Sequence, residues 1–173
     1  QLGFDSFTDA IKIIGQNVSE GALIIVETTV PPGTCEKLVV PTLSFELCKR
    51  GIKSDTVLVA HSFERVMPGK NYLASITDYW RVFSGYTKEA GDACEKFLET
   101  IIDVQNFPLT RLSSMTASET AKVMENSYRA VNIAFIDEWT KYAEAVGIDL
   151  YEVVEAIKKR NTHSNIRFPG LGV

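Results

Sequence analysis

The sequence predicts an α/β protein, followed along the chain by a helical region that contains one long helix. Three short runs of apolar and β-branched residues alternate with segments whose apolar residues recur at helical intervals. From about residue 114 to residue 146 the chain has neither proline nor glycine. The alternation predicts βαβ units and a mostly parallel sheet, because parallel strands need a crossover connection that is usually a helix.

The first predicted elements are a helix, a strand and a second helix. Apolar residues at helical spacing predict a helix over residues 6–18, and the continuous apolar run at 22–26 predicts a strand buried on both faces. A Thr-Thr-Val-Pro-Pro-Gly-Thr loop follows at 28–34, which its two prolines make stiff. Residues 34–49 are predicted to be helical, with a kink at Pro41.

Two further buried strands are expected at residues 56–60 and 79–84, and a last edge strand at 104–107. Residues 87–100 form an amphipathic helical pattern between them. In an open α/β sheet, ligands bind beyond the carboxyl ends of the strands, so the loops after residues 26 and 60 are the candidate binding loops.

The helix predicted over residues 114–146 would be about 50 Å long, at about 1.5 Å per residue. It is apolar on more than one side around residues 131–139, which predicts contacts with its own domain and with a second surface. We therefore expect a symmetric dimer through this helix. Gly147 ends it, and a shorter helix capped by Asp149 is predicted at 150–159.

Composition narrows the function classes. A chain of 173 residues with 45% hydrophobic residues can bury a core, and a net charge of −4 argues against a nucleic-acid-binding surface. No apolar run reaches the roughly 18 residues that a membrane helix needs. The sequence begins at Gln1 with no signal-peptide pattern, so we expect the natural N-terminus to lie upstream.

The three cysteines, Cys35, Cys48 and Cys94, are odd in number and lack C-x-x-C spacing. Neither a disulfide framework nor a metal site is predicted, and we expect reduced, buried thiols. This usage is typical of a reducing cytoplasm. His61 and His163 lie far apart in the sequence and are expected to be ordinary histidines.

Several polar residues are candidates for chemistry. Lys122 and Asn126 are four apart and share one helix face, where an ammonium and an amide can stabilise an oxyanion; the alternative is a solvated surface pair. Glu64 follows a strand and could act as a general base or orient a ligand, or could form an ion pair with Arg65. Thr29 could hold a water or a ribose, or cap the following helix.

Taken together, four segments resemble the nucleotide-sugar dehydrogenase family, that is, the UDP-glucose/GDP-mannose dehydrogenases and their UDP-N-acetylhexosamine relatives. Each segment is weak alone, but their order and spacing over nearly the whole chain are fairly specific. The segments are Val-Glu-Thr-Thr-Val-Pro-Pro-Gly-Thr at 26–34, Ser-Phe-Glu-Arg-Val-Met-Pro-Gly at 62–69, Ala-Lys-Val-Met-Glu-Asn-Ser-Tyr-Arg-Ala-Val-Asn-Ile-Ala at 121–134 and Pro-Gly-Leu-Gly-Val at 169–173.

The resemblance implies an NAD-dependent, two-step oxidation of a sugar C6 alcohol to a carboxylate, in an enzyme that supplies polysaccharide precursors. It implies that residues 1–110 are the second half of a Rossmann-like NAD-binding domain. Residues 111–173 would be a truncated central helical dimerisation domain. The cofactor's Gly-rich loop would then precede Gln1, and a catalytic cysteine and the sugar-nucleotide domain would follow Val173. On that basis we expect the 173-residue chain alone to be inactive.

The resemblance also implies roles for individual residues. Lys122 and Asn126 match the family's oxyanion-stabilising lysine and asparagine, and Glu64 matches its active-site glutamate, which helps to activate water. Thr29 matches a threonine near that water and the cofactor, which also places Thr28 beside the cofactor. Substrate-binding residues would be Glu64, Arg65, Val66, Lys122 and Asn126. Phe63 departs from the family pattern, in which proline usually precedes the glutamate.

Two alternatives remain open. β-Hydroxyacid and 6-phosphogluconate-type dehydrogenases also carry a Lys-x-x-x-Asn pair on a long helix, but the 29–34 and 64–69 segments favour the sugar-nucleotide family. A non-catalytic dimerisation module would use only the long helix.

The substrate sugar is not determined, although the Arg-Val-Met-Pro-Gly run at 65–69 leans towards the N-acetylhexosamine branch. Arg129, Arg160 and Arg167 are candidate phosphate or cross-subunit contacts.

Overall fold

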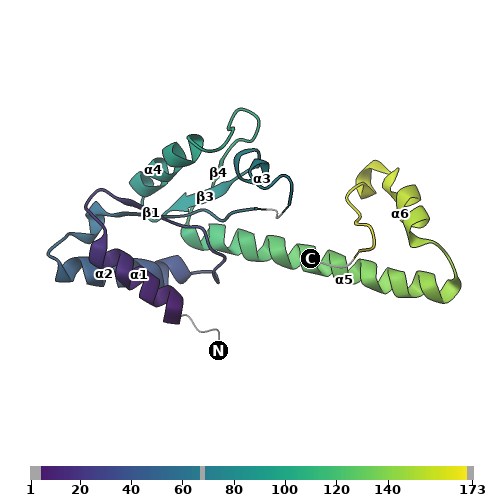
Figure 1. Ribbon diagram of the computed structural model, residues 1–173, viewed down its shortest axis with the longest axis horizontal. Helices are drawn as coiled ribbons and strands as arrows, with labels where there is room; N and C mark the ends of the chain where they lie inside the picture. Colours follow the sequence, from purple (N-terminus) through teal and green to yellow (C-terminus); the bar gives the residue numbers. More distant parts are fainter. Residues whose placement is uncertain (1–4, 67–68, 171–173) are drawn as a thin grey trace. The chain divides into compact units, whose positions relative to one another are not determined.

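The computed structural model describes residues 5–66 and 69–170 (Figure 1). The chain divides into two compact units, residues 1–123 and 124–173, and the long helix α5 (Met115–Val146) belongs to both. Nothing in the described part of the chain combines the length and the apolar character of a membrane-crossing helix.

The first unit is built on a four-stranded sheet with the order β1-β2-β3-β4. β1 pairs with β2 and β3 pairs with β4 in parallel, whereas β2 and β3 are antiparallel. The α/β class and the mostly parallel sheet are thus confirmed, with one antiparallel pairing in its middle. The strands are β1 (Leu23–Val26), β2 (Leu58–His61), β3 (Val82–Gly85) and β4 (Thr110–Arg111).

Helices cover both faces of this sheet: α1 and α2 pack together on one side and α4 on the other (Figure 1). Their starts and ends lie close to the predicted limits, and a short helix, α3, was not predicted. The helical segments of this unit are α1 (Asp5–Asn17), a π-helical turn (Cys35–Val39), α2 (Val40–Lys49), a 3₁₀ turn (Ser54–Thr56), α3 (Ala74–Thr77) and α4 (Lys88–Glu99).

The predicted edge strand at 104–107 is wrong. Phe107 donates its N–H to the Asp103 carbonyl, so this segment forms a turn, and the fourth strand comes later, at β4. Val104 and Phe107 instead pack against the core on the α4 side of the sheet. Their apolar character therefore reflects packing rather than strand pairing.

Pro41 marks a change of helix type. The residues before it form a π-helical turn, and α2 begins at Val40 with the proline in its first turn. Because proline lacks an N–H and clashes with the preceding turn, it fits the first turn of a helix but not its interior. The predicted kink is realised as this junction.

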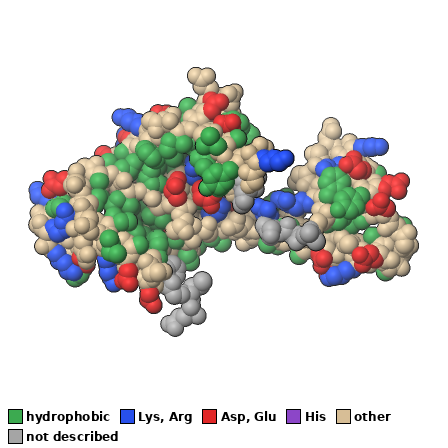
Figure 2. All heavy atoms as spheres, in the orientation of Figure 1, with side chains coloured by type: hydrophobic (Ala, Val, Ile, Leu, Met, Phe, Trp, Pro, Cys, Tyr) green, Lys and Arg blue, Asp and Glu red, His purple; other side chains and the backbone are tan. Residues whose placement is uncertain are grey.

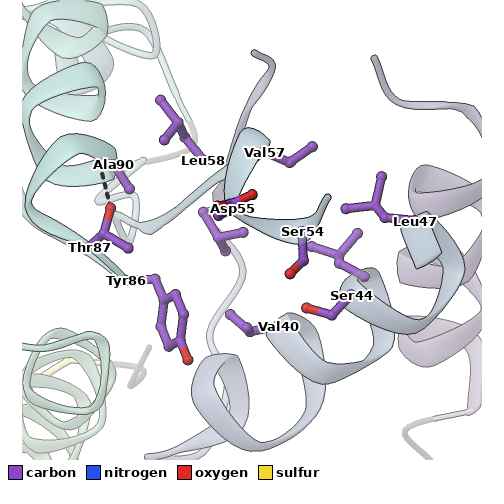
Figure 3. Close-up of a pocket in the computed structure, with 12 residues that line it drawn as sticks. Val40, Ser44, Leu47, Ser54, Asp55, Val57, Leu58, Tyr86, Thr87 and Ala90 are labelled. Atoms are coloured by element: carbon purple, nitrogen blue, oxygen red, sulfur yellow. Dashed lines mark hydrogen bonds between the residues drawn. The ribbon is translucent and has the colours of Figure 1, made fainter. Parts of the chain in front are cut away.

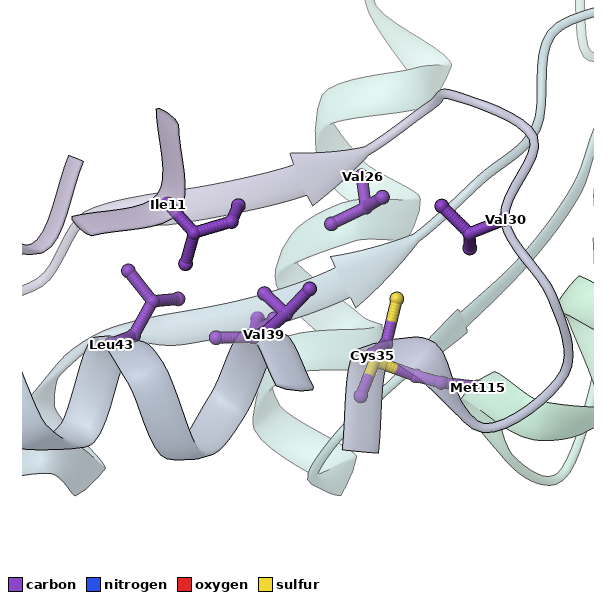
Figure 4. Close-up of a cluster of buried hydrophobic side chains, with 8 residues drawn as sticks. Ile11, Val26, Val30, Cys35, Val39, Leu43 and Met115 are labelled. Atoms are coloured by element: carbon purple, nitrogen blue, oxygen red, sulfur yellow. The ribbon is translucent and has the colours of Figure 1, made fainter. Parts of the chain in front are cut away.

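Two hydrophobic clusters hold the sheet between its helix layers. One joins α1 and α2 to β1, β2 and the first residue of α5, and Figure 4 shows its side chains converging. The other lies between the sheet and α4 and includes the fully buried Phe83. The first cluster contains Ile11, Val26, Val30, Cys35, Val39, Leu43, Val59 and Met115.

The second unit has a small core. It contains the rest of α5, helix α6 (Leu150–Lys158) and a 3₁₀ turn (Asn161–His163). Gly147 has φ 72°, a left-handed conformation that ends a helix readily, and Asp149 caps α6 by accepting the Tyr151 N–H at 2.8 Å. The predicted helix ends and the predicted cap are confirmed.

Candidate functional site

The two loops that carry the predicted polar residues leave the sheet side by side. β1 and β2 are parallel, Val26 lies opposite His61, and the Ser62 N–H donates to the Val26 carbonyl at 3.0 Å. The segments bearing Thr29 and Glu64 therefore start from the same edge of the sheet, as the positions of these residues at the carboxyl ends of strands predicted.

The loop after β1 exposes its threonines and buries the residue that follows them. Thr28 and Thr29 are exposed, while Val30 is buried in the hydrophobic core. The next helical turn begins at Cys35 with Thr34 in the N-cap position, so the alternative that Thr29 caps this helix is wrong. Both threonines are thus exposed at the sheet edge, next to a buried neighbour.

A buried glutamate on α5 holds the end of this loop. The Glu119 carboxylate, 1% exposed, accepts the Cys35 N–H at 2.7 Å on one oxygen and the Gly33 N–H at 2.5 Å on the other. Gly33 has φ 86°, which favours glycine and turns its N–H inward. Backbone N–H groups at a helix start attract an anion, so the buried charge is hydrogen-bonded on both oxygens.

The first N–H groups of α5 are capped by Glu36, from the π-helical turn after the proline loop, and by Ser114, directly before α5. The Thr116 N–H donates to the Glu36 carboxylate at 3.4 Å, and the Ala117 N–H donates to the Ser114 hydroxyl at 3.1 Å. Glu36 and Glu119 thus each supply acceptors for the first turn of the opposite helix. This exchange fixes the Pro-Pro-Gly loop against the helix that carries Lys122.

A buried polar chain links the ends of β2 and β3 to the same helix. His61 Nδ1 lies 2.7 Å from the Ser118 hydroxyl, which lies 2.7 Å from the Ser84 hydroxyl and donates to the Met115 carbonyl at 3.0 Å. All three polar side chains are fully buried. Burial lowers the pKa of His61, and the nearby Glu119 carboxylate opposes that shift. Among the described residues, His61 Nε2 is a buried polar atom without a hydrogen-bond partner.

The loop after β2 brings Glu64 and Lys122 together. The Lys122 ammonium donates to the Glu64 backbone carbonyl at 2.9 Å, and the Glu64 carboxylate accepts the Val66 N–H at 2.5 Å. Phe63, between them and the sheet, is 1% exposed, whereas Glu64 is half-buried. A cation and a carboxylate are therefore available at the sheet edge, beside the loop that carries Thr29.

Arg65 extends this cluster towards the strand on the other side. Its guanidinium donates to the Trp80 carbonyl at 2.7 Å and lies 5.2 Å from the centre of the Phe63 ring. Arg65 and Val66 are half-buried, and the predicted Met67-Pro68 positions lie outside the described residues.

Asn126 falls in the second unit. It is exposed on α5, four residues after the half-buried Lys122. The helical spacing of the pair is confirmed, since α5 is continuous through both positions.

Three residues important to this geometry were missed from the sequence: His61, Ser118 and Glu119. The signal that could have found the last two is their spacing, since they precede Lys122 by four and three residues and so share its helix face. The sequence alone predicts an ordinary histidine at His61, because a single histidine at a strand end gives no pattern that reveals a buried partner.

The cysteines divide by burial. Cys35 and Cys94 are buried as predicted, but Cys48 is exposed, so the expectation of three buried thiols was wrong at that position. Burial raises the pKa of Cys94 to about 12, and burial beside Glu119 raises that of Cys35. Both buried thiols are therefore protonated and poor nucleophiles at neutral pH.

The cavities lie elsewhere. One of about 190 Å³ is lined by residues before and at the start of β2, such as Asp55 and Val57, and by Tyr86 after β3 (Figure 3). This is the opposite end of β2 from Glu64. The cavity is therefore separate from the sheet edge that carries Thr28, Thr29, Glu64, Arg65 and Lys122, which we call the polar edge. The second unit carries a cavity of about 920 Å³ lined by α5, α6 and residues 166–170, with Arg129, Lys158 and Arg167 among its walls.

Comparison with known families identifies the chain. Residues 116–173 match the central domain of the UDP-glucose/GDP-mannose dehydrogenase family. The chain belongs to this family, and the match begins at the second residue of α5, the helix that holds both loops of the polar edge.

Individual relatives extend the match to nearly the whole chain. It is 33% identical over 166 residues to a UDP-N-acetyl-D-mannosamine dehydrogenase of Pyrococcus horikoshii. This alignment covers 95% of this chain and 37% of that relative. It is 30% identical over 170 residues to an NDP-N-acetyl-D-galactosaminuronic acid dehydrogenase of Ralstonia nicotianae, which covers 95% of this chain and 38% of the relative. The chain thus spans little more than a third of the length of these relatives.

Solved structures show the same fold. The structure of the Pyrococcus horikoshii UDP-D-ManNAc dehydrogenase superposes with a TM-score of 0.81 and 32% identity, over 98% of this chain and 38% of that one. A UDP-N-acetyl-mannosamine dehydrogenase of Staphylococcus aureus gives a TM-score of 0.80 and 29% identity, over 98% and 39%.

Proposed function

We propose that this chain is part of an NAD-dependent nucleotide-sugar 6-dehydrogenase, which oxidises the C6 alcohol of a UDP- or GDP-sugar to the carboxylate in two steps. The observation that carries the proposal is the contact between the Lys122 ammonium and the Glu64 backbone, at the sheet edge where the Thr28-Thr29 loop also starts. Relatives named as UDP- and NDP-sugar dehydrogenases align over 95% of the chain and support it.

In this proposal two hydrogen-bond donors of the site stabilise an oxygen atom that becomes negative. The Lys122 ammonium and the Asn126 amide would donate hydrogen bonds to the developing oxyanion at C6, which lowers the barrier only if they are already in position. The Glu64 carboxylate would accept a proton from the water that completes the second oxidation. The backbone of Arg65 and Val66 would line the site of the sugar nucleotide.

Thr28 and Thr29 would contact the cofactor from the exposed loop after β1. These residues would help to hold NAD, which would supply the hydride acceptor for each oxidation. The buried Val30 and the hydrogen bonds from Gly33 and Cys35 to Glu119 fix both ends of the segment that follows these threonines. A loop held in this way can present its hydroxyls without reorganising.

The domain assignment is part of the same proposal. Residues 1–110 would belong to the Rossmann-like NAD-binding domain and residues 111–173 to the central helical domain. A substrate with an N-acetylhexosamine sugar is favoured, because relatives with such names are found among the matches. A cytoplasmic location is proposed as well, since free cysteines are typical of a reducing compartment.

The decisive test replaces Lys122 in the full-length protein that contains this chain. Lys122→Ala should reduce turnover of a UDP-N-acetylhexosamine at least about a hundredfold, the usual cost of removing one oxyanion donor. Lys159→Ala, which alters an exposed lysine after α6, is the matched control and should retain full turnover. Unchanged turnover in Lys122→Ala would exclude the proposed mechanism.

The coding sequence beyond Val173 provides an independent test. A Gly-Gly-x-Cys motif within about a dozen codons would support the covalent, two-step reaction. A continuation without a cysteine would leave Lys122 and Asn126 to a single-step dehydrogenase of the β-hydroxyacid type.

We also propose that the protein forms a homodimer through α5. In the second unit this helix exposes an apolar stripe whose members are spaced by four, three, four, seven and four residues, so that they share one face. Apolar surface concentrated in this way usually marks an interface. The stripe consists of Met124, Tyr128, Val131, Phe135, Tyr142 and Val146, which are 50–68% exposed. Light scattering that shows a stable monomer at high micromolar concentration would contradict the proposal.

A further inference from the structure

Phe63 is a buried aromatic residue beside the contact between Lys122 and Glu64. It immediately precedes Glu64 and is 1% exposed. Two cations lie over this ring: the Lys122 ammonium at 5.4 Å from the ring centre and the Arg65 guanidinium at 5.2 Å. Both distances are within the roughly 6 Å at which a cation is attracted to an aromatic face.

The two cations are each fixed by a second contact. Lys122 donates to the Glu64 carbonyl at 2.9 Å, and Arg65 donates to the Trp80 carbonyl at 2.7 Å. The negative face of an aromatic ring attracts a cation that lies over it, and here the same ring contacts both cations. An apolar aliphatic side chain of similar volume would fill the space without this attraction.

We infer that Phe63 is a positioning residue that holds the Lys122 ammonium against the Glu64 backbone. A lysine side chain has four rotatable bonds and loses much of its rotamer freedom when it is fixed. Water can replace the Glu64 carbonyl as a hydrogen-bond acceptor for this ammonium. The Phe63 ring adds a second attraction that favours the positive charge at this position. This role rests on the proposed function only in so far as Lys122 is catalytic; the holding of Lys122 is a property of the chain itself.

The first experiment measures that property directly. The full-length protein that contains this chain is acetylated with a water-soluble N-hydroxysuccinimide ester of acetic acid, and the rate at Lys122 is compared by peptide mass spectrometry with that at exposed Lys159 in the same sample. Phe63→Leu should raise the relative rate about two- to fivefold, the equivalent of a cation–π contact at a partly exposed site. Phe63→Tyr, which keeps the ring, should leave it near the original value.

The matched control is Phe83→Leu. Phe83 is also fully buried, but it lies in the cluster beneath α4, so its replacement loosens the core without touching the Lys122 ring contact. Equal rates at Lys122 in Phe63→Leu and Phe83→Leu would overturn the inference, because general loosening would then explain both. If Phe63→Leu does not fold, Phe63→Met takes its place in the same comparison.

The second experiment uses the full-length enzyme. Phe63→Leu should lower kcat about two- to fivefold with KM for the nucleotide sugar unchanged, since only the placement of the cation is altered. Phe83→Leu should leave kcat unchanged. If Lys122→Ala abolishes turnover, the proposed function stands. If Phe63→Leu then has the same kcat and the same acylation rate at Lys122 as Phe83→Leu, the inference about Phe63 fails. If Lys122→Ala is fully active, the proposed function fails and the acylation experiment alone decides the role of Phe63.

Discussion

The two units of this chain bury their apolar residues very differently. In the first, helices on both faces of the sheet enclose two clusters, and α5 contributes Met115 to one of them. In the second, the core is essentially Ala143, Leu150 and Val154 with a few half-buried neighbours. Hydrophobic side chains remain at the surface of both units (Figure 2), but on α5 of the second unit several of them follow one helix face. This exposed apolar face, beside a small core, is the basis of the proposed dimer contact through α5.

The polar residues show the same contrast. In the first unit, buried polar side chains are hydrogen-bonded across elements, as in the Glu119 clamp and the His61–Ser118–Ser84 chain. In the second unit the charged pairs are exposed, such as Lys141 with Asp137 and Glu138. Exposed ion pairs contribute little to stability, whereas a buried carboxylate that loses its partners is costly.

The largest expected effect is on the stability of the first unit. Glu119→Ala should lower its free energy of unfolding by about 3 kcal/mol, because two buried N–H groups lose a charged acceptor. Urea unfolding can be followed by the fluorescence of Trp80 in a Trp139→Phe background, since the two tryptophans lie one in each unit. Glu144→Ala, at an exposed position of the same helix, should change it by less than about 0.5 kcal/mol.

The second effect is on self-association. Phe135→Asp would place a charge in the middle of the apolar stripe and should weaken dimerisation about a hundredfold or more, because both copies would bury an unpaired carboxylate. Sedimentation velocity measures the change, and Glu138→Ala beside the stripe is the control. If Phe135→Asp dimerises with unchanged affinity, the apolar stripe on α5 is not the dimer interface.

A smaller effect concerns pH. Because the pKa of His61 is lowered in the folded protein, the unfolded chain binds more protons below about pH 6.5. The stabilising contribution is present above that pH and is lost as the pH falls towards the lowered folded pKa, by at most about 1.4 kcal/mol per pH unit. Urea unfolding between pH 7.5 and pH 5 should therefore show a shallower pH dependence in His61→Asn. Equal slopes in the two proteins would mean that His61 does not titrate differently on folding.

The smallest effect is chemical and leaves the fold intact. At pH 8, iodoacetamide should modify Cys48 and spare Cys35 and Cys94, whose raised pKa values keep both thiols protonated. Mass spectrometry of the intact chain should show a single adduct. Three adducts formed at the same rate would show that burial does not protect Cys35 and Cys94 in solution.

Periodicity in the sequence was sufficient for most of the fold. The predicted bounds of α1, α4, α5 and α6 lie close to the observed ones. Each of these helices has an apolar stripe and a glycine, proline or capping residue near its end. The edge strand at 104–107 was misplaced, since Val104 and Phe107 are apolar for packing against the α4 side of the core. A short apolar run does not distinguish these two causes.

What the sequence by itself determined is the set of elements, the positions of Glu64 and Thr29 at strand ends, and the family to which the segments point. Only the tertiary structure decided that Glu119, and not Thr29, caps the helix after the proline loop, that β2 and β3 run antiparallel, and that Phe63 lies beneath Lys122. Local spacing records what one helix or strand buries. Contacts between residues some 60 to 90 positions apart depend on how those elements pack, which no local pattern records.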